Sequence, residues 1–178
     1  ERERLTGEAT QSTTDFGGVA SRANDGNTDG NYWNNSVTHT LNNDSEAWWQ
    51  LELKEPVAIS KIVLWNRQGM RRRLVNFRVR LLDTADQEVW GQDYLTEPAA
   101  VAPNPKLEIT LATEPVAAKL RIEKIGPTVL GEYILSLAEV EVFAAIGFGR
   151  GEHTFAALQQ ISQVAASSEI SDEGSLGE

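Results

Sequence analysis

The chain has 178 residues, of which 26 are acidic and 16 are Lys or Arg, so its formal net charge is −10. This surplus of negative charge repels a phosphate backbone, and we therefore expect neither nucleic-acid binding nor attraction to an anionic membrane surface. The absence of cysteine excludes disulfides, thiol catalysis and cysteine-ligated metal sites. No apolar run approaches the roughly 20 residues needed for membrane insertion, so a soluble globular protein is expected.

Short runs of alternating or β-branched residues, separated by turn residues, dominate the chain from Trp48 to residue 144. Such runs are typical of strands with one buried face. The pattern predicts strands at about 7–14, 48–53, 59–65, 75–83, 87–95, 106–112, 117–125 and 137–144. Helical periodicity is almost absent before residue 150, so the fold class is predicted to be all-β, either a sandwich or a barrel. Eight strands would suit a jelly roll.

Alternation within these strands also predicts which side chains form the core. The predicted set is Trp48 or Trp49, Ile62, Leu64, Phe77, Val79, Leu120, Ile122, Val140 and Val142. In the last strand the apolar alternation changes phase at Glu139. A phase change at a carboxylate suggests a β-bulge or a functional site.

Residues 15–47 differ from the rest of the domain, because they are rich in Gly, Asn, Asp, Ser and Thr. A loop of this length inside a compact domain is uncommon and usually functional. Its closely spaced oxygen-bearing side chains are the type that calcium prefers, although an Asp-Gly-Asn sequence by itself is more often an ordinary turn.

The composition changes again after about Ala145. We expect one domain at 1–146, followed at 147–178 by a linker or tail. A weak similarity between ATQSTTDFGG near the start and AASSEISDEG in this tail leaves open the start of a truncated second module. Because the chain begins with Glu1 rather than Met, we expect it to be an excerpt of a larger multidomain protein.

Five motifs occur in a fixed order along residues 7–144. They are DGN followed by Trp33, SVTH ending at His39, the paired Trp48-Trp49, Asn66-Arg67 with the Arg cluster and RLVNFRV, and AEVEVF at 138–143. In this order and spacing the chain resembles the F-type lectins, or fucolectins, within the galactose-binding, discoidin-like group that includes the C-type domains of coagulation factors V and VIII. The resemblance implies an eight-stranded antiparallel β-sandwich of the jelly-roll, galactose-binding-domain-like type. It also implies a bound calcium ion, a fucose-binding pocket, and an extracellular or cell-surface location.

The resemblance implies a calcium site built from loop 15–47 and the last strand. Arg22, Asn27 and Ala138 would contribute backbone carbonyls, Asp25 and Glu139 would contribute carboxylates, and Ser36 would contribute its carbonyl and hydroxyl. The two carboxylates and several neutral oxygens suit a hard cation.

The resemblance also implies a carbohydrate-binding pocket formed by His39, Arg67 and Arg73. Guanidinium and imidazole groups present directed hydrogen bonds to sugar hydroxyls. This chain departs from the family pattern in three ways. It has Gly69 where the family usually has a carboxylate, and it lacks the family's adjacent cysteines. The spacing between Arg67 and Arg73 is also one residue shorter than usual, so Arg72 is an alternative to Arg73. Trp33 and Met70 are candidates for apolar contact with the sugar.

The leading interpretation is a calcium-dependent, non-catalytic module that binds fucose-like sugars or glycan termini. An alternative is a discoidin-like adhesion domain that binds a protein partner and uses calcium only structurally. A glycoside hydrolase fragment would need two carboxylates flanking a sugar, and neither Glu46, Glu52 nor Glu141 is identified as part of such a pair. We therefore expect no enzymatic activity.

Overall fold

The computed structural model describes residues 2–95 and 102–147, and within them eight strands and three short 3-10 helices. The strands are β1 (Arg4–Leu5), β2 (Gly7–Gln11), β3 (Trp48–Asn66), β4 (Phe77–Leu82), β5 (Glu88–Tyr94), β6 (Lys106–Thr110), β7 (Val116–Lys124) and β8 (Leu137–Ala144), and the helices are η1 (Ala20–Ala23), η2 (Tyr32–Asn34) and η3 (Arg71–Arg73). None of the described helices is long and apolar enough to cross a membrane.

The chain divides into two units, Glu1–Ala145 and Ile146–Glu178. The second unit lies almost entirely outside the described residues, and so does the linker, tail or truncated module predicted for 147–178. All eight of the described strands belong to the first unit.

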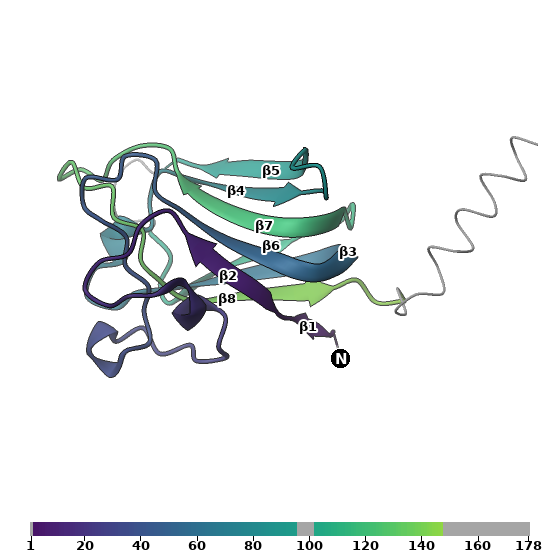
Figure 1. Cartoon of the computed structure of the whole chain (residues 1–178), viewed down its shortest axis with the longest axis horizontal. Helices are drawn as coiled ribbons and strands as arrows, with labels where there is room; N and C mark the ends of the chain where they lie inside the picture. The colour runs from purple at the N-terminus through teal and green to yellow at the C-terminus, as the bar shows by residue number, and fades with distance from the viewer. Residues whose placement is uncertain (1, 96–101, 148–178) are drawn as a thin grey trace, which may run out of the picture. The chain divides into compact units, whose positions relative to one another are not determined.

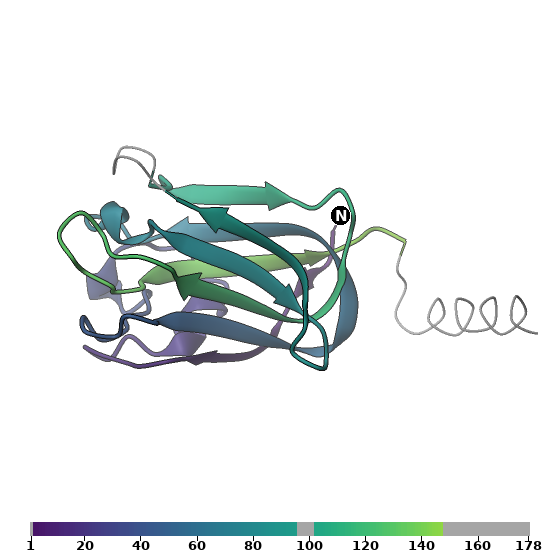
Figure 2. The same ribbon diagram turned by 90° about the horizontal axis from the view of Figure 1, so that it is seen from above.

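Two antiparallel sheets form this unit (Figures 1 and 2). In one sheet β8 lies between β1 and the second half of β3, which also pairs with β6. In the other, the first half of β3 lies between β2 and β7, and the sheet continues through β4 to β5. This arrangement confirms the predicted all-β, galactose-binding-like sandwich.

The two strands predicted at 48–53 and 59–65 are one strand, β3, which serves both sheets. Its pairing with β7 shifts register between Glu52 and Val57, around Pro56. Proline has no N–H to donate to the ladder, so the strand can bend and leave one sheet for the other at this point. The sequence prediction was therefore wrong in ending one strand and starting another, and it also missed the two-residue β1.

The β4–β5 hairpin shows how alternation produces the layers. Phe77, Val79 and Leu81 are completely buried, whereas Arg78 and Arg80 face outward and form ion pairs with Glu88 on β5. The connecting turn is held by Asp83, whose Oδ1 accepts hydrogen bonds from the backbone N–H groups of Ala85 (2.8 Å) and Gln87 (2.9 Å). An aspartate that caps its own turn in this way is a common start of a tight connection.

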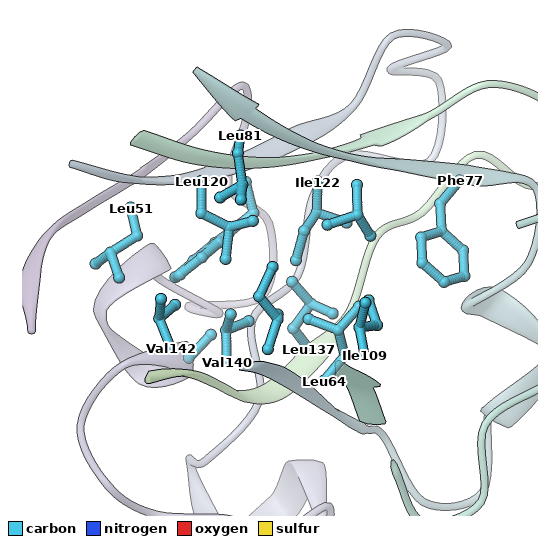
Figure 3. Close-up of a cluster of buried hydrophobic side chains, with 14 of the residues drawn as sticks. Leu51, Leu64, Phe77, Leu81, Ile109, Leu120, Ile122, Leu137, Val140 and Val142 are labelled. Atoms are coloured by element: carbon cyan, nitrogen blue, oxygen red, sulfur yellow. The ribbon is translucent and has the colours of Figure 1, made fainter. Parts of the chain in front are cut away.

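Apolar side chains from the two sheets meet in a single core (Figure 3). Leu120 and Ile122 on β7 point toward Val140 and Val142 on β8, and each of the four is completely buried. The predicted core is confirmed, with Trp49 rather than Trp48 as its tryptophan.

The long loop between β2 and β3 lies at one end of the sandwich, where η3 and the loop between β7 and β8 also lie (Figures 1 and 2). Loop 15–47 contains no strand, as predicted, but includes η1 and η2. It is attached to β8 and the residues just before it by backbone hydrogen bonds from Thr38 N to Leu137 O (2.9 Å) and from Thr40 N to Leu135 O (3.2 Å). The candidate site residues are gathered at this loop end.

Truncation of the core should destabilise the domain strongly. Leu120→Ala removes a completely buried side chain and is expected to lower the free energy of unfolding by about 2–5 kcal/mol in a denaturant titration. Val116→Ala on the same strand removes a side chain that is 49% exposed, and should change it by less than about 0.5 kcal/mol. Equal effects of the two substitutions would contradict the described packing.

Candidate functional site

Arg73 and His39 form the buried centre of the loop end. Arg73 is 8% exposed and His39 4% exposed, and Arg73 Nη1 lies 3.4 Å from His39 Nε2. Because a guanidinium can only donate, His39 Nε2 must accept, which places the imidazole proton on Nδ1. Nδ1 lies 2.7 Å from the carbonyl oxygen of Thr40 and donates to it. His39 is therefore the neutral tautomer with one nitrogen directed at Arg73.

The surroundings of His39 favour this neutral form. Burial lowers the pKa of His39 below its ordinary value of 6.5, and the nearby charges of Arg73 and Arg67 lower the pKa further. The hydrogen bond to Thr40 and the charge of Asp15 act in the opposite direction. The backbone of His39 is fixed as well, because its N–H donates to Gly18 O at 2.9 Å.

Arg67 lies in the turn that follows β3. Asn66, at the end of β3, orients the turn: its side-chain oxygen accepts the N–H of Arg67 (2.8 Å), and its amide donates to the carbonyl of Arg71 (3.0 Å). The Arg67 guanidinium carbon lies 4.4 Å from the centre of the Tyr32 ring, a cation–π contact that fixes its direction. Burial, and then the charge of Arg73, lower the pKa of Arg67, so the two guanidinium groups interact.

Loop 15–47 and the Arg67 turn are joined at Gly30. Gly30 O accepts the N–H of Gln68 at 2.9 Å. A Cβ atom at position 30 would lie 2.8 Å from Gln68 Cγ and 2.9 Å from Asn66 O, closer than side chains normally approach, so the junction requires glycine. The loop that carries His39 and the turn that carries Arg67 are consequently one packed unit.

The other predicted sugar-site residues occupy different environments. Arg72 is directed to Glu132, with 3.8 Å between Arg72 Nε and Glu132 Oε2, whereas Arg73 is the arginine that contacts His39. Trp33 is 83% exposed and its ring meets the Tyr32 ring edge-on at 5.5 Å. Met70 is half-buried, and its carbonyl accepts the N–H of Arg73 at 3.0 Å.

Glu139 is the centre of the predicted calcium site and is completely buried on β8. The β3–β8 pairing is irregular beside it, since Trp65 pairs with Glu139 but Asn66 pairs with Leu137. Glu139 Oε1 accepts a hydrogen bond from Arg4 Nη2, and Oε2 accepts one from Gly26 N, each at 2.8 Å. Burial raises the pKa of Glu139 to about 7, opposed by the charge of Arg4.

The remaining predicted ligands lie in loop 15–47, apart from Ala138, which is buried next to Glu139. Asp25 is near enough to Glu139 for its carboxyl group to raise the pKa of Glu139, and Asp25 Oδ1 accepts the N–H of Asn27 at 2.9 Å. The hydroxyl of Ser36 is buried, 2.5 Å from Asp29 O and 3.0 Å from Asn31 O.

The side chain of Arg22 donates to Val37 O at 3.3 Å, and its charged end therefore points to the loop backbone. Within residues 2–95 and 102–147 no cluster of three or more His, Cys, Asp and Glu residues could hold a metal. A calcium ion here would depend on two carboxylates supplemented by neutral oxygens, a donor set that its chemistry accepts.

Four residues of the site were missed from the sequence: Arg4, Tyr32, Lys124 and Glu132. Lys124 could have been found, since it continues the inward alternation of Leu120 and Ile122. Its ammonium group is buried and donates to the carbonyls of Arg73 (3.0 Å) and Val75 (2.5 Å), and burial lowers the pKa of Lys124 to about 8. No local pattern marks Arg4, Tyr32 or Glu132 as members of the site.

The sandwich with a polar site at its loop end defines a galactose-binding-like domain. Residues 22–121 match the family described as NedA-like, galactose-binding domain, and the chain belongs to this family. Fucolectin-3 of Anguilla japonica is 40% identical over 68 residues, which are 35% of this chain and 37% of that protein. The match thus spans little more than a third of that relative's length.

Solved structures of similar sequence share the fold over most of the chain. The lectin domain of Lectinolysin, complexed with Lewis B antigen, is 39% identical with a TM-score of 0.69, and the comparison covers 78% of this chain and 93% of that one. The Streptococcus pneumoniae fucose binding module SpX-3 is 35% identical with a TM-score of 0.69, covering 82% of this chain and 98% of that one.

The tautomer and environment of His39 predict an unusual titration. In an NMR titration of the His153→Gln variant, which leaves the His39 resonance alone, the midpoint should fall below pH 6.5. Arg73→Met should raise the midpoint, because it removes a nearby positive charge and a donor to Nε2, whereas Arg71→Met at an exposed position should not. As the pH falls, the unfolded chain protonates His39 at a higher pH than the folded domain does, because the pKa of His39 is lower in the folded domain. The contribution of neutral His39 to the free energy of unfolding is therefore complete above pH 6.5 and is lost as the pH falls through the lowered pKa. A midpoint above 6.5, or one unaffected by Arg73→Met, would contradict this arrangement.

Proposed function

We propose that the described domain is a non-catalytic carbohydrate-binding module that recognises a fucose-like sugar or the terminus of a glycan. The observation that carries the proposal is the convergence of His39, Arg67 and Arg73 from a loop, a strand end and a 3-10 turn. The relatives support it, because their names describe a fucolectin and fucose-binding and lectin domains.

The chemistry of these three groups suits a neutral sugar. Each guanidinium offers several N–H donors in a fixed plane to hydroxyl and ring oxygens, and His39 Nε2 offers an acceptor in its neutral form. Tyr32 holds Arg67 in one direction, so less conformational entropy is lost when a ligand is bound. Trp33 and Phe16, which are 83% and 72% exposed, provide apolar rings beside the site for a longer glycan.

The same contacts argue against glycoside hydrolysis. Glu139 is buried and engaged by Arg4 and Gly26, and Glu141 accepts the indole N–H of Trp65 at 2.8 Å. Both carboxylates have structural partners. We therefore propose binding without catalysis, in a module of a larger extracellular or cell-surface protein.

We further propose that calcium stabilises this loop end, with Asp25 and Glu139 as charged ligands and Ser36 and the carbonyls of Arg22, Asn27 and Ala138 as neutral ones. The buried Glu139 carboxyl group supports the proposal, because burial raises its pKa to about 7 and a cationic partner would stabilise its charged form. In the described arrangement Arg4 serves as that partner at Oε1. An ion bound to loop 15–47 and β8 would clamp the segment that continues to His39.

Sugar binding should depend on both guanidinium groups. A dissociation constant of about 10–100 μM for L-fucose corresponds to about 5.5–7 kcal/mol. Because a hydrogen bond to a charged group contributes about 1.5–3 kcal/mol, Arg67→Ala and Arg73→Ala should each weaken binding roughly 10- to 100-fold in titration calorimetry.

Arg71→Ala is the matched control, since Arg71 lies in the same turn but is exposed, and it should bind like the wild type. Unchanged affinity in both test variants would place the sugar elsewhere. Absence of wild-type binding to any sugar on a glycan array, together with capture of a protein partner, would favour an adhesion domain.

Calcium should raise the stability of the domain in the absence of sugar. Ion at about 100 times its dissociation constant is expected to add about 2.7 kcal/mol to the free energy of unfolding, and EDTA should remove this gain. Asp25→Asn should abolish the response, whereas Asp86→Asn in the β4–β5 turn should retain it. If neither calcium nor EDTA changes the melting temperature, a structural calcium ion is excluded.

Arg4 and calcium should compete for Glu139. Arg4→Gln removes the guanidinium from Oε1, so calcium affinity measured by the thermal shift should increase, while the variant without calcium should be less stable than the wild type. Arg2→Gln at an exposed neighbouring position is the control. Weaker calcium binding in Arg4→Gln would show that the two cations do not share this carboxylate.

A further inference from the structure

Glu132 lies in the loop between β7 and β8 and faces the arginines of η3. Glu132 Oε1 is 3.4 Å from Arg73 Nη2, and Glu132 Oε2 is 3.8 Å from Arg72 Nε. The Glu132 side chain is 20% exposed and that of Arg73 is 10% exposed, so the pair is largely withdrawn from solvent. One carboxylate is thus shared between two neighbouring guanidinium groups.

The loop that carries Glu132 is held in a defined turn. Thr128 N donates to Glu132 O at 2.8 Å, and Thr128 Oγ1 accepts the backbone N–H of Glu132 at 3.2 Å. Gly131 has a φ of +75°, the left-handed conformation that glycine adopts without strain. Since Thr128 is itself buried, these bonds fix the Glu132 backbone relative to the sandwich.

The charges around Arg73 explain why this carboxylate matters. Within the described residues, the Arg73 guanidinium contacts His39 and Glu132, its charge acts on Arg67, and its backbone carbonyl accepts a hydrogen bond from Lys124. Glu132 is the carboxylate that an ion pair joins to Arg73. The turn from Asn66 to Leu74 contains no acidic residue. A buried cation among other cations is unfavourable unless an anion compensates it.

We infer that Glu132 is a positioning residue of the sugar site, whose carboxylate holds the Arg73 guanidinium in the orientation that reaches His39. The inference rests on the proposed function. Glu132 acts through Arg73 and need not touch the sugar. Glu132 comes from a loop distant in sequence and supplies the negative charge that the turn from Asn66 to Leu74 lacks.

The test is a double-mutant cycle read by NMR titration of L-fucose. Glu132→Gln keeps the shape of the side chain but removes its charge, and should weaken sugar binding roughly 3- to 10-fold, the size expected for coupled neighbouring groups. In the Arg73→Ala background the same substitution should have no further effect. Glu108→Gln, which removes an exposed carboxylate that pairs with Lys61 and Lys106, is the matched control and should bind like the wild type.

A second variant covers the case in which Glu132→Gln fails to fold. Thr128→Val removes the hydroxyl that accepts the Glu132 N–H without changing any charge, and should also weaken binding only when Arg73 is present. Wild-type affinity in Glu132→Gln, or an equal loss with and without Arg73, would overturn the inference while leaving the sugar site in place. If the wild type binds no sugar, the proposed function and the inference both fail.

Discussion

The loop end depends on keeping two like-charged guanidinium groups beside a buried imidazole. Burial, and then the charge of Arg73, lower the pKa of Arg67, and burial together with the charges of both arginines lowers the pKa of His39. The surrounding structure compensates with groups of different kinds: the ring of Tyr32 beneath Arg67 and the carboxylate of Glu132 beside Arg73. The arrangement keeps directed donors of two arginines and an imidazole acceptor close together.

The fold supplies the means to bring these groups together. β3 crosses from one sheet to the other and ends at Asn66, whose side chain fixes the Arg67 turn. The pairing of β3 with β8 shifts register beside Glu139. The loop that carries His39 forms backbone hydrogen bonds with Leu135, just before β8, and with Leu137, the first residue of β8. Each contributor to the site therefore follows or contacts the end of a strand, and the position of each is determined by the rigid sandwich. The proposed calcium ion would take the place of Arg4 at Glu139 and would strengthen the attachment of loop 15–47 to β8 that hydrogen bonds such as Gly26 N to Glu139 Oε2 already provide.

Period-2 alternation predicted the sandwich and its core because burial on one face of a strand constrains every second residue, as in Phe77, Val79 and Leu81. The same logic found the irregularity at Glu139. It failed at Pro56, where a turn signal marks a bend within one strand rather than an end. Tyr32, Arg4 and Glu132 could not be predicted, because each acts through a partner distant in sequence, and only the tertiary structure brings Glu132 to Arg73 or Arg4 to Glu139.

In the proposed function, one sugar is bound jointly by groups from three segments. A crystal structure of the protein grown with calcium and L-fucose tests it most directly. We expect a monosaccharide within hydrogen-bond distance of His39 Nε2 and of the guanidinium groups of Arg67 and Arg73, with the aromatic ring of Tyr32 still beneath Arg67. A sugar bound on another surface, such as that of Trp65 and Lys106 on the outer face of the sheet, with the three groups unoccupied, would contradict it.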